Sequence, residues 1–328
     1  MNDPEPQSPR GAVSEPASDH PPRGAAYQSL QPISSPSVHS VFVSPQGLRV
    51  PWRLLLYLLM GLLLVFILGS GLALWHAHGG ARLWKGVVGE AMLAFSAIVP
   101  GFAMARIEKR PFGIYGLPGG GVFRKNFWVG TMWGLVALSV LLLFMRAAGT
   151  VSFGGLALHG VRILKFAAFY ALLFLIVGFF EEFLVRGYTL YTLTQGIGFW
   201  PAAVILSAVF GALHLGNGGE AWIGILAAAS IGFFFCLTLR RTGTLWWAVG
   251  FHMSWDWGET YLYSVPNSGT ISPGHLLTSN FHGSPWLSGG SVGPEGSIFA
   301  FVVIALMWII FDRVYRQARY PDTTPQQS

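Results

Sequence analysis

Charged residues are scarce in this chain. Asp, Glu, Lys and Arg make up only 10% of its 328 residues, whereas a soluble domain usually carries about 25%. Hydrophobic residues make up 52%, and they include 13 Trp and 25 Phe. So few charges cannot cover a water-exposed surface. The composition therefore excludes an ordinary soluble domain and indicates segments that face lipid.

Cysteine is almost absent as well. The single cysteine, Cys236, lies in an apolar run and has no second cysteine to pair with. An internal disulfide framework is therefore excluded, and the fold must be held by packing and polar contacts alone.

The N-terminal 48 residues lack hydrophobic periodicity. They are rich in Pro, Ser, Gly and Gln, a composition that buries too little surface to offset the entropy of ordering. The first apolar run starts too late to be a signal peptide at Met1. We expect a disordered tail over 1–48, a transmembrane helical domain over 49–318 and a short C-terminal tail over 319–328.

Apolar runs recur along the rest of the chain. A helix needs about 20 apolar residues to cross the hydrocarbon core of a bilayer. The fifth and seventh runs are the weaker ones, because they carry His, Asp and Glu, and no internal repeat is visible. The predicted fold is all-α, a polytopic transmembrane bundle. Its eight helices are expected at about 52–75, 87–106, 126–147, 164–191, 197–215, 221–239, 243–263 and 296–315.

The Lys and Arg residues predict the orientation of this bundle. With the N-terminus in the cytoplasm and eight spans, 14 of them fall inside and 5 outside. The loop at about 264–295 contains neither Lys nor Arg and falls outside. This bias predicts a multi-pass protein of the cell membrane with both termini in the cytoplasm. It also accounts for the formal net charge of +6 without a nucleic-acid partner.

Polar residues interrupt the fourth apolar run. A charge at bilayer depth costs at least about 2.5–3.5 kcal/mol, so their presence requires an explanation. Glu182 and Arg186 are four residues apart, which places them on one helix face as an ion pair. A buried ion pair is the simplest interpretation, but it leaves the adjacent Glu181 unexplained.

Two further polar clusters lie in the fifth and seventh runs. His214 stands at the end of the fifth run, where a lone His is more often structural than catalytic. His252 and Asp256 in the seventh run are four apart and share a face. Either the two side chains form a hydrogen bond that only satisfies two buried polar groups, or together they bind a water, an oxyanion or a metal.

The three clusters together favour a shared site. Each must avoid lipid by facing the interior of the bundle, and one common polar cavity satisfies all three. A carboxylate with two imidazoles is a set of groups that activates water. The residues expected to meet there are Glu181, His214, His252 and Asp256, with Glu182 and Arg186 in support.

These motifs resemble those of a known family. Glu-Glu-x-x-x-Arg at 181–186, Phe-x-x-x-His at 210–214 and His-x-x-x-Asp at 252–256 are similar to the motifs of the CPBP intramembrane proteases, also called the Abi or CAAX-protease family, which includes the type II prenyl-protein endopeptidases. The resemblance covers roughly residues 164–260. It implies an endopeptidase that hydrolyses a membrane-associated protein or peptide, with its catalytic core at about 164–263.

The resemblance also implies roles for the site residues. Glu181 would activate the attacking water and His214 would assist. His252 and Asp256 would stabilise the oxyanion or, in an older view, bind a metal. Many family members carry Asn at the last position, and an Asn amide can donate a hydrogen bond whereas an ionised Asp only accepts. Asp256 therefore orients His252, binds a cation or is protonated.

The sequence leaves alternatives open for both the cofactor and the function. The zinc-protease pattern His-Glu-x-x-His is absent. Two His with Glu181 would suit a divalent metal such as zinc, and a metal-free Glu-activated water, which we favour, fits equally. The same buried charges would suit a proton-coupled transporter, although no inverted repeat is visible. A non-catalytic membrane scaffold or immunity protein is the third alternative.

Three other features are not assigned to the catalytic site. Glu90 in the second run is interpreted as structural. Glu259 follows Asp256 by three residues on a nearby face and is a weaker candidate for the cavity. The Gly-rich stretch 283–296 lacks a Gly-Lys-Ser/Thr phosphate motif and is expected to be an exposed loop.

Overall fold

The computed structural model describes residues 42–44, 47–77 and 82–320. Most of the predicted disordered tail, residues 1–41 and 45–46, lies outside this range, as do residues 321–328 of the predicted C-terminal tail. At the end of the predicted tail, β1 (Val43–Ser44) and β2 (Gly47–Leu48) pair as antiparallel strands.

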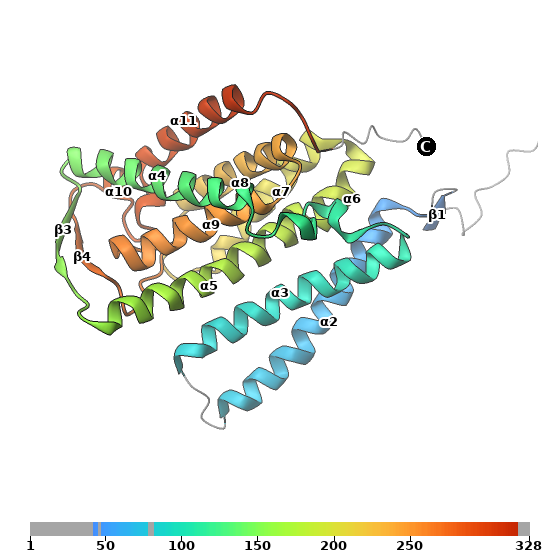
Figure 1. Ribbon diagram of the computed structural model, residues 1–328, viewed down its shortest axis with the longest axis horizontal. Helices are drawn as coiled ribbons and strands as arrows, with labels where there is room; N and C mark the ends of the chain where they lie inside the picture. The colour runs from blue at the N-terminus through green and yellow to red at the C-terminus, as the bar shows by residue number, and fades with distance from the viewer. Residues whose placement is uncertain (1–41, 45–46, 78–81, 321–328) are drawn as a thin grey trace, which may run out of the picture. The chain divides into compact units, whose positions relative to one another are not determined.

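The predicted all-α fold is confirmed, and helix covers all eight predicted runs (Figure 1). The eight helices that match them are α2 (Val50–Ala77), α3 (Arg82–Ile107), α4 (Lys125–Ala147), α5 (Val161–Arg186), α7 (Phe199–Leu213), α8 (Trp222–Thr242), α9 (Trp246–Trp257) and α11 (Ile298–Val314). Two shorter helices are α6 (Tyr188–Ile197) and α10 (Pro285–Ser288).

Several of these helices are long and apolar enough to cross a bilayer. By length and composition, six stretches in the described part of the chain qualify: Val50–Trp75, Trp84–Ile107, Lys125–Ala147, Val161–Ile197, Phe199–Gly216 and Trp222–Thr242. Helix α11 is shorter, with 17 residues, and α9 has 12 before it continues as a π-helical turn, Gly258–Tyr263.

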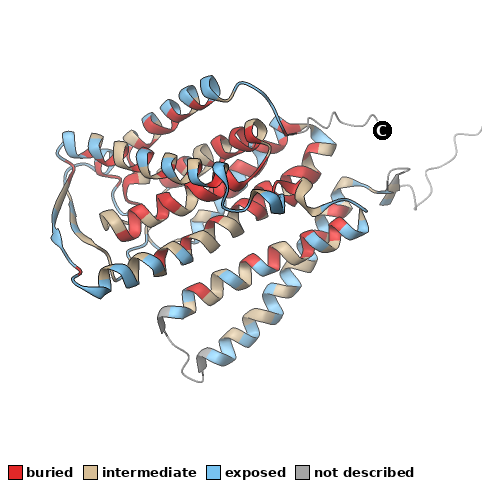
Figure 2. Cartoon of the chain, in the orientation of Figure 1, coloured by how far each residue is buried: buried red, intermediate tan, exposed pale blue. Residues whose placement is uncertain are grey.

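Many apolar residues of these helices are exposed, and Figure 2 shows exposed positions in pale blue along α2. On α2, Leu62 is 64% exposed and Phe66 is 72% exposed. A soluble protein rarely exposes apolar surface on this scale, and in a bilayer the same surface is covered by lipid. The protein is therefore built to span a membrane several times.

The predicted run 164–191 is divided in two by Gly187. Helix α5 ends at Arg186 and α6 begins at Tyr188. A Cβ atom on Gly187 would lie 2.4 Å from the carbonyl oxygen of Phe183, so only glycine permits this close approach. The break lets α6 leave the axis of α5 directly after the polar cluster.

Small residues bring α4 and α9 into close contact. A Cβ atom on Gly130 would lie 2.0 Å from the carbonyl oxygen of Trp247, and one on Gly134 would lie 2.2 Å from Ser254 Oγ. The two glycines are four residues apart and form one stripe on α4. Such a stripe lets helix backbones approach closely in a membrane, where dispersion forces drive association.

Adding one methyl group to this stripe is expected to destabilise the bundle. We expect Gly134→Ala to lower the free energy of unfolding by about 1–3 kcal/mol, the usual cost of overpacking. Gly71→Ala is the matched control, because a Cβ atom there would meet no atom within 4 Å and alanine favours helix. Thermal unfolding in detergent measures both. Equal melting temperatures for the two variants would contradict the close packing of α4 and α9.

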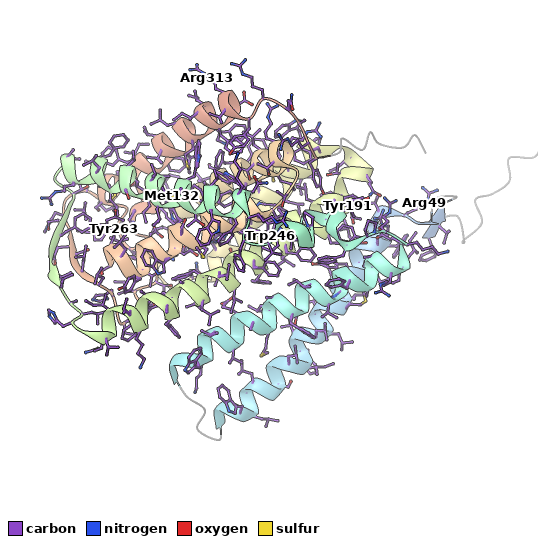
Figure 3. All side chains as sticks on the ribbon, viewed as in Figure 1. Arg49, Met132, Tyr191, Trp246, Tyr263 and Arg313 are labelled. Atoms are coloured by element: carbon purple, nitrogen blue, oxygen red, sulfur yellow. The ribbon has the colours of Figure 1, made fainter. Side chains whose placement is uncertain are left out.

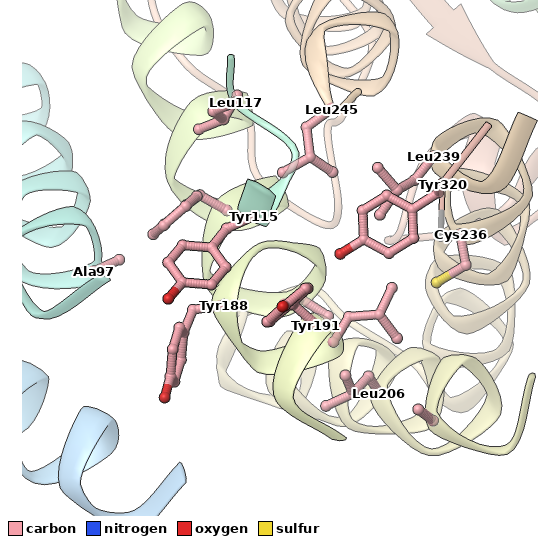
Figure 4. Close-up of a cluster of buried hydrophobic side chains, with 14 of the residues drawn as sticks. Ala97, Tyr115, Leu117, Tyr188, Tyr191, Leu206, Cys236, Leu239, Leu245 and Tyr320 are labelled. Atoms are coloured by element: carbon pink, nitrogen blue, oxygen red, sulfur yellow. The ribbon is translucent and has the colours of Figure 1, made fainter. Parts of the chain in front are cut away.

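A buried aromatic cluster fills the end of the bundle near α6 (Figure 4). The ring of Tyr115 lies 5.0 Å from that of Tyr188 and 5.1 Å from that of Tyr191. Tyr320, from the predicted C-terminal tail, is only 4% exposed, and its backbone N–H donates to the carbonyl oxygen of Arg240. The first two residues of that predicted tail are thus packed against the bundle.

A buried ion pair ties α2 to α3. Arg53 Nη2 lies 2.7 Å from Glu108 Oε2, and Arg53 Nη1 donates to Gln195 Oε1 at 2.6 Å. Tyr188 donates its hydroxyl to Glu108 Oε1 at 2.5 Å. These bonds join α2 and the end of α3 to α6, which attaches the outer helix pair to the rest of the bundle (Figure 1).

The loop between α9 and α11 differs from its prediction. The strand β4 (Leu277–Phe281) pairs antiparallel with β3 (Val151–Leu156), which precedes α5. The stretch 283–296, expected to be an exposed loop, is partly buried, with Val292 only 1% exposed and Gly296 buried. The prediction of an exposed loop was wrong, because a glycine-rich composition does not reveal that backbone packs against backbone. A Cβ atom on Gly289 would lie 1.6 Å from the carbonyl oxygen of Gly293.

Candidate active site

A cavity of about 300 Å³ lies between the helices that carry the polar clusters. Its walls come from α3, α5, α7, α8, α9 and α11 and from the loop before α11. Apolar side chains form part of the lining. The polar or charged lining residues are Glu90, Glu181, His214, Asn217, His252, Asp256, Thr260, Asn267, Ser268, Thr270, Ser272 and Glu295.

Glu181, His252 and Asp256 meet at the wall of this cavity. His252 Nε2 lies 3.6 Å from Glu181 Oε2 and 3.5 Å from Asp256 Oδ2. The Glu181 side chain is 27% exposed, whereas those of His252 and Asp256 are 12% and 10% exposed. Of the three, Glu181 is the most accessible to a molecule that enters the cavity.

Glu182 and Arg186 lie behind this wall. Both side chains are fully buried, and Arg186 Nη1 donates to Glu182 Oε1 at 2.8 Å. The same carboxylate oxygen lies 3.1 Å from His252 Nδ1. A carboxylate oxygen only accepts, so in this hydrogen bond Nδ1 carries the proton. Glu182 therefore contacts both a fixed cation and the imidazole that faces the cavity.

Aromatic rings and a glycine enclose the Arg186 guanidinium. Its Cζ lies 4.3 Å from the centre of the Phe210 ring and 5.4 Å from that of Phe235. Arg186 Nε also donates to the carbonyl oxygen of Gly232 at 3.2 Å. A Cβ atom on Gly232 would lie 2.6 Å from Arg186 Nη2, so this position leaves space for the cation.

His214 lines the same cavity from the end of α7. Its Nδ1 lies 2.9 Å from the carbonyl oxygen of Phe210, and a carbonyl oxygen only accepts. Nδ1 is therefore the protonated nitrogen in this contact, and Nε2 stays available to a water or a substrate. The Phe210 ring lies 4.8 Å from the His214 ring and 6.5 Å from the His252 ring.

The six predicted site residues thus occupy two layers. Four of them line the cavity: Glu181, His214, His252 and Asp256. Glu182 and Arg186 do not line it and support His252 from behind. The contact between Glu182 and His252 was not predicted, because it depends on how α5 and α9 are rotated toward one another.

Two carboxylates of the lining were not predicted from the sequence. Glu90, interpreted as structural, lines the cavity from α3, and Glu295 lines it from the loop before α11. Glu295 accepts hydrogen bonds from Trp255 Nε1 at 3.1 Å and from Ser268 Oγ at 2.7 Å. Its place in a glycine-rich loop gave no sequence signal. Glu259, the weaker candidate, is fully buried and does not line the cavity.

A metal site is not apparent in the described ranges. No group of three His, Cys, Asp or Glu side chains there is arranged to hold a metal ion. The ring nitrogens of His252 contact three carboxylates directly, so these groups are directed at the imidazole and not at a common central point. These distances fit a hydrogen-bonded and ionic cluster.

The comparison with known proteins agrees with the resemblance seen in the motifs. Residues 163–258 match the family model "Type II CAAX prenyl endopeptidase Rce1-like". No curated protein and no solved structure matches the chain. The matched segment runs from the start of α5 to the end of α9 and contains all six predicted site residues. The resemblance predicted from the sequence is thereby confirmed: this multi-pass membrane protein carries, over 163–258, a segment that matches the Rce1-like family model.

Proposed function

We propose that this protein is an intramembrane endopeptidase in which Glu181 activates the attacking water. One observation carries the proposal. Glu181 is the most accessible member of a cluster with His252 and Asp256, and this cluster lines a cavity of about 300 Å³. The matched family segment supports peptide-bond hydrolysis as the reaction.

The proposed reaction begins with a water in the cavity. Nε2 of His214, left free by the contact of Nδ1 with Phe210, accepts a hydrogen bond from this water and orients it. Glu181 takes the other proton, and the oxygen attacks the scissile carbonyl carbon. Glu181 then passes the proton to the leaving amine as the C–N bond breaks. The carboxylate is regenerated, so protons balance over one turnover.

His252 and Asp256 are proposed to stabilise the tetrahedral intermediate. Glu182 and Arg186 hold the His252 ring from the Nδ1 side, so its Nε2 edge faces the cavity. In the imidazolium form, Nε2–H donates to the developing oxyanion and supplies positive charge where negative charge forms. Asp256, at 3.5 Å from the same nitrogen, orients the ring. This role suits an acceptor and accounts for Asp in the position where many family members carry Asn.

The test is cleavage of membrane-spanning reporter peptides by purified protein in liposomes, followed by mass spectrometry. We expect His214→Ala to reduce the rate by about 10²-fold, because the water loses the group that orients it and a misplacement of about 1 Å can cost that much. His159→Ala is the matched control, because His159 is exposed and does not line the cavity. A scaffold or immunity protein would cleave nothing, and its biological activity would tolerate both changes.

The same liposomes test the transporter alternative. A proton-coupled transporter would acidify or alkalinise the liposome interior in response to a solute gradient without producing peptide fragments. We expect fragments and no coupled proton flux.

A further inference from the structure

A second hollow, of about 350 Å³, lies far from the chemistry proposed above, at the end of the bundle where α8 and α11 finish. Arginine dominates its lining. The lining residues are Arg241, Arg313, Val314, Tyr315, Arg316, Gln317 and Arg319. Figure 3 shows Arg313 at the outer end of α11.

The positive charge of this hollow is mostly uncompensated. Arg241 forms an ion pair with Asp312, and its Nη1 donates to the carbonyl oxygen of Arg316. Within the ranges that the structure describes, no carboxylate pairs with Arg313, Arg316 or Arg319. Arg241 Nε is buried and also lacks a hydrogen-bond partner there. Arginine clusters of this kind bind phosphate, which their guanidinium groups contact through paired hydrogen bonds.

The surroundings of the hollow indicate a lipid as the source of that phosphate. The stretch Trp222–Thr242, which is long and apolar enough to cross a bilayer, ends beside Arg241, which would put the hollow at the level of the bilayer surface. Directly below it, α11 exposes an apolar face, with Ile310 50% exposed and Val314 63% exposed. A headgroup in the hollow would place an acyl chain along this face. A free phosphate would gain nothing from it.

We propose that this hollow binds the headgroup of an anionic phospholipid. Arg313, Arg316 and Arg319 contact the phosphate, and the outer face of α11 contacts an acyl chain. With both termini in the cytoplasm, as the sequence predicts, the hollow faces the cytoplasmic leaflet. Basic residues next to a membrane span attract anionic lipids in that leaflet.

The test is a titration of the full-length protein, purified in detergent, with phosphatidylglycerol or phosphatidylcholine, and native mass spectrometry counts the bound lipids. We expect one phosphatidylglycerol to bind at least tenfold more tightly than phosphatidylcholine. R313A/R319A should lower the affinity for phosphatidylglycerol about tenfold. Both positions are exposed, so the melting temperature should stay unchanged.

The matched control is R124A/K125A, which removes two exposed positive charges at the start of α4, on the same predicted side of the membrane. We expect this variant to bind like the wild type. Equal loss in the two variants would reduce the effect to general surface charge and overturn the site. Equal affinity of the wild type for the two lipids would overturn it as well. Displacement of phosphatidylglycerol by millimolar inorganic phosphate would overturn the lipid assignment in favour of free phosphate.

Discussion

Replacing Glu181 by Gln is expected to lower kcat for peptide-bond cleavage by about 10²–10⁴-fold, the contribution of a positioned general base. The amide keeps the size of the side chain and its place at the cavity wall, but it cannot take the proton from water. Because Glu181 is 27% exposed and makes no buried ion pair with Arg186, the fold should stay intact. Single-turnover cleavage in liposomes, with enzyme in excess over substrate and at a saturating concentration, measures the chemical step.

A neighbouring carboxylate provides the control for this experiment. Glu90 lines the same cavity from α3, so Glu90→Gln makes the same substitution in the same cavity. We expect it to change kcat less than tenfold, since Glu90 is not in the cluster around His252. Activity close to wild type in Glu181→Gln would remove Glu181 from the role of base. Equal losses in both variants would mean that the overall charge of the cavity, and no single base, sets the rate.

Helix positions and the pairs within one helix were predictable from the sequence. Apolar runs identified the membrane helices because a spanning helix needs a long uninterrupted apolar segment. A spacing of four residues placed Glu182 beside Arg186 and His252 beside Asp256, since such residues share a helix face. Both pairs are close in the structure, at 2.8 Å and 3.5 Å. These features depend on helix geometry alone.

Contacts between elements were harder to predict. The hydrogen bond from His252 to Glu182 depends on the rotation of α5 against α9, which the glycine contacts of α9 help to fix. Glu295 reaches the cavity through a loop whose path follows from tertiary packing. Glu259 was placed on a helical face near Asp256, but the chain enters a π-helical turn at Gly258. Glu259 is fully buried in this turn and does not line the cavity.

The buried ion pair between Glu182 and Arg186 is expected to give the largest stability effect of any single substitution at the site. Both side chains are fully buried. Glu182→Ala leaves the Arg186 guanidinium charged and without its carboxylate, which costs about 3–5 kcal/mol of unfolding free energy. Reversible unfolding in mixed micelles measures the loss. Asp312→Asn is the control, because the pair between Asp312 and Arg241 is partly exposed and such pairs contribute about 0–1 kcal/mol.

Removing both charges separates the structural role of the pair from its role in catalysis. Apolar residues of similar volume often replace a buried ion pair without loss of stability, so Glu182→Leu/Arg186→Met should recover most of the stability that Glu182→Ala loses. Cleavage should not recover, because the hydrogen bond that His252 Nδ1 donates to Glu182 is still missing and the ring is no longer held toward the cavity. A double variant that regained both stability and wild-type cleavage would contradict this. It would show that Glu182 serves only to neutralise Arg186, and that His252 is oriented by Asp256 alone.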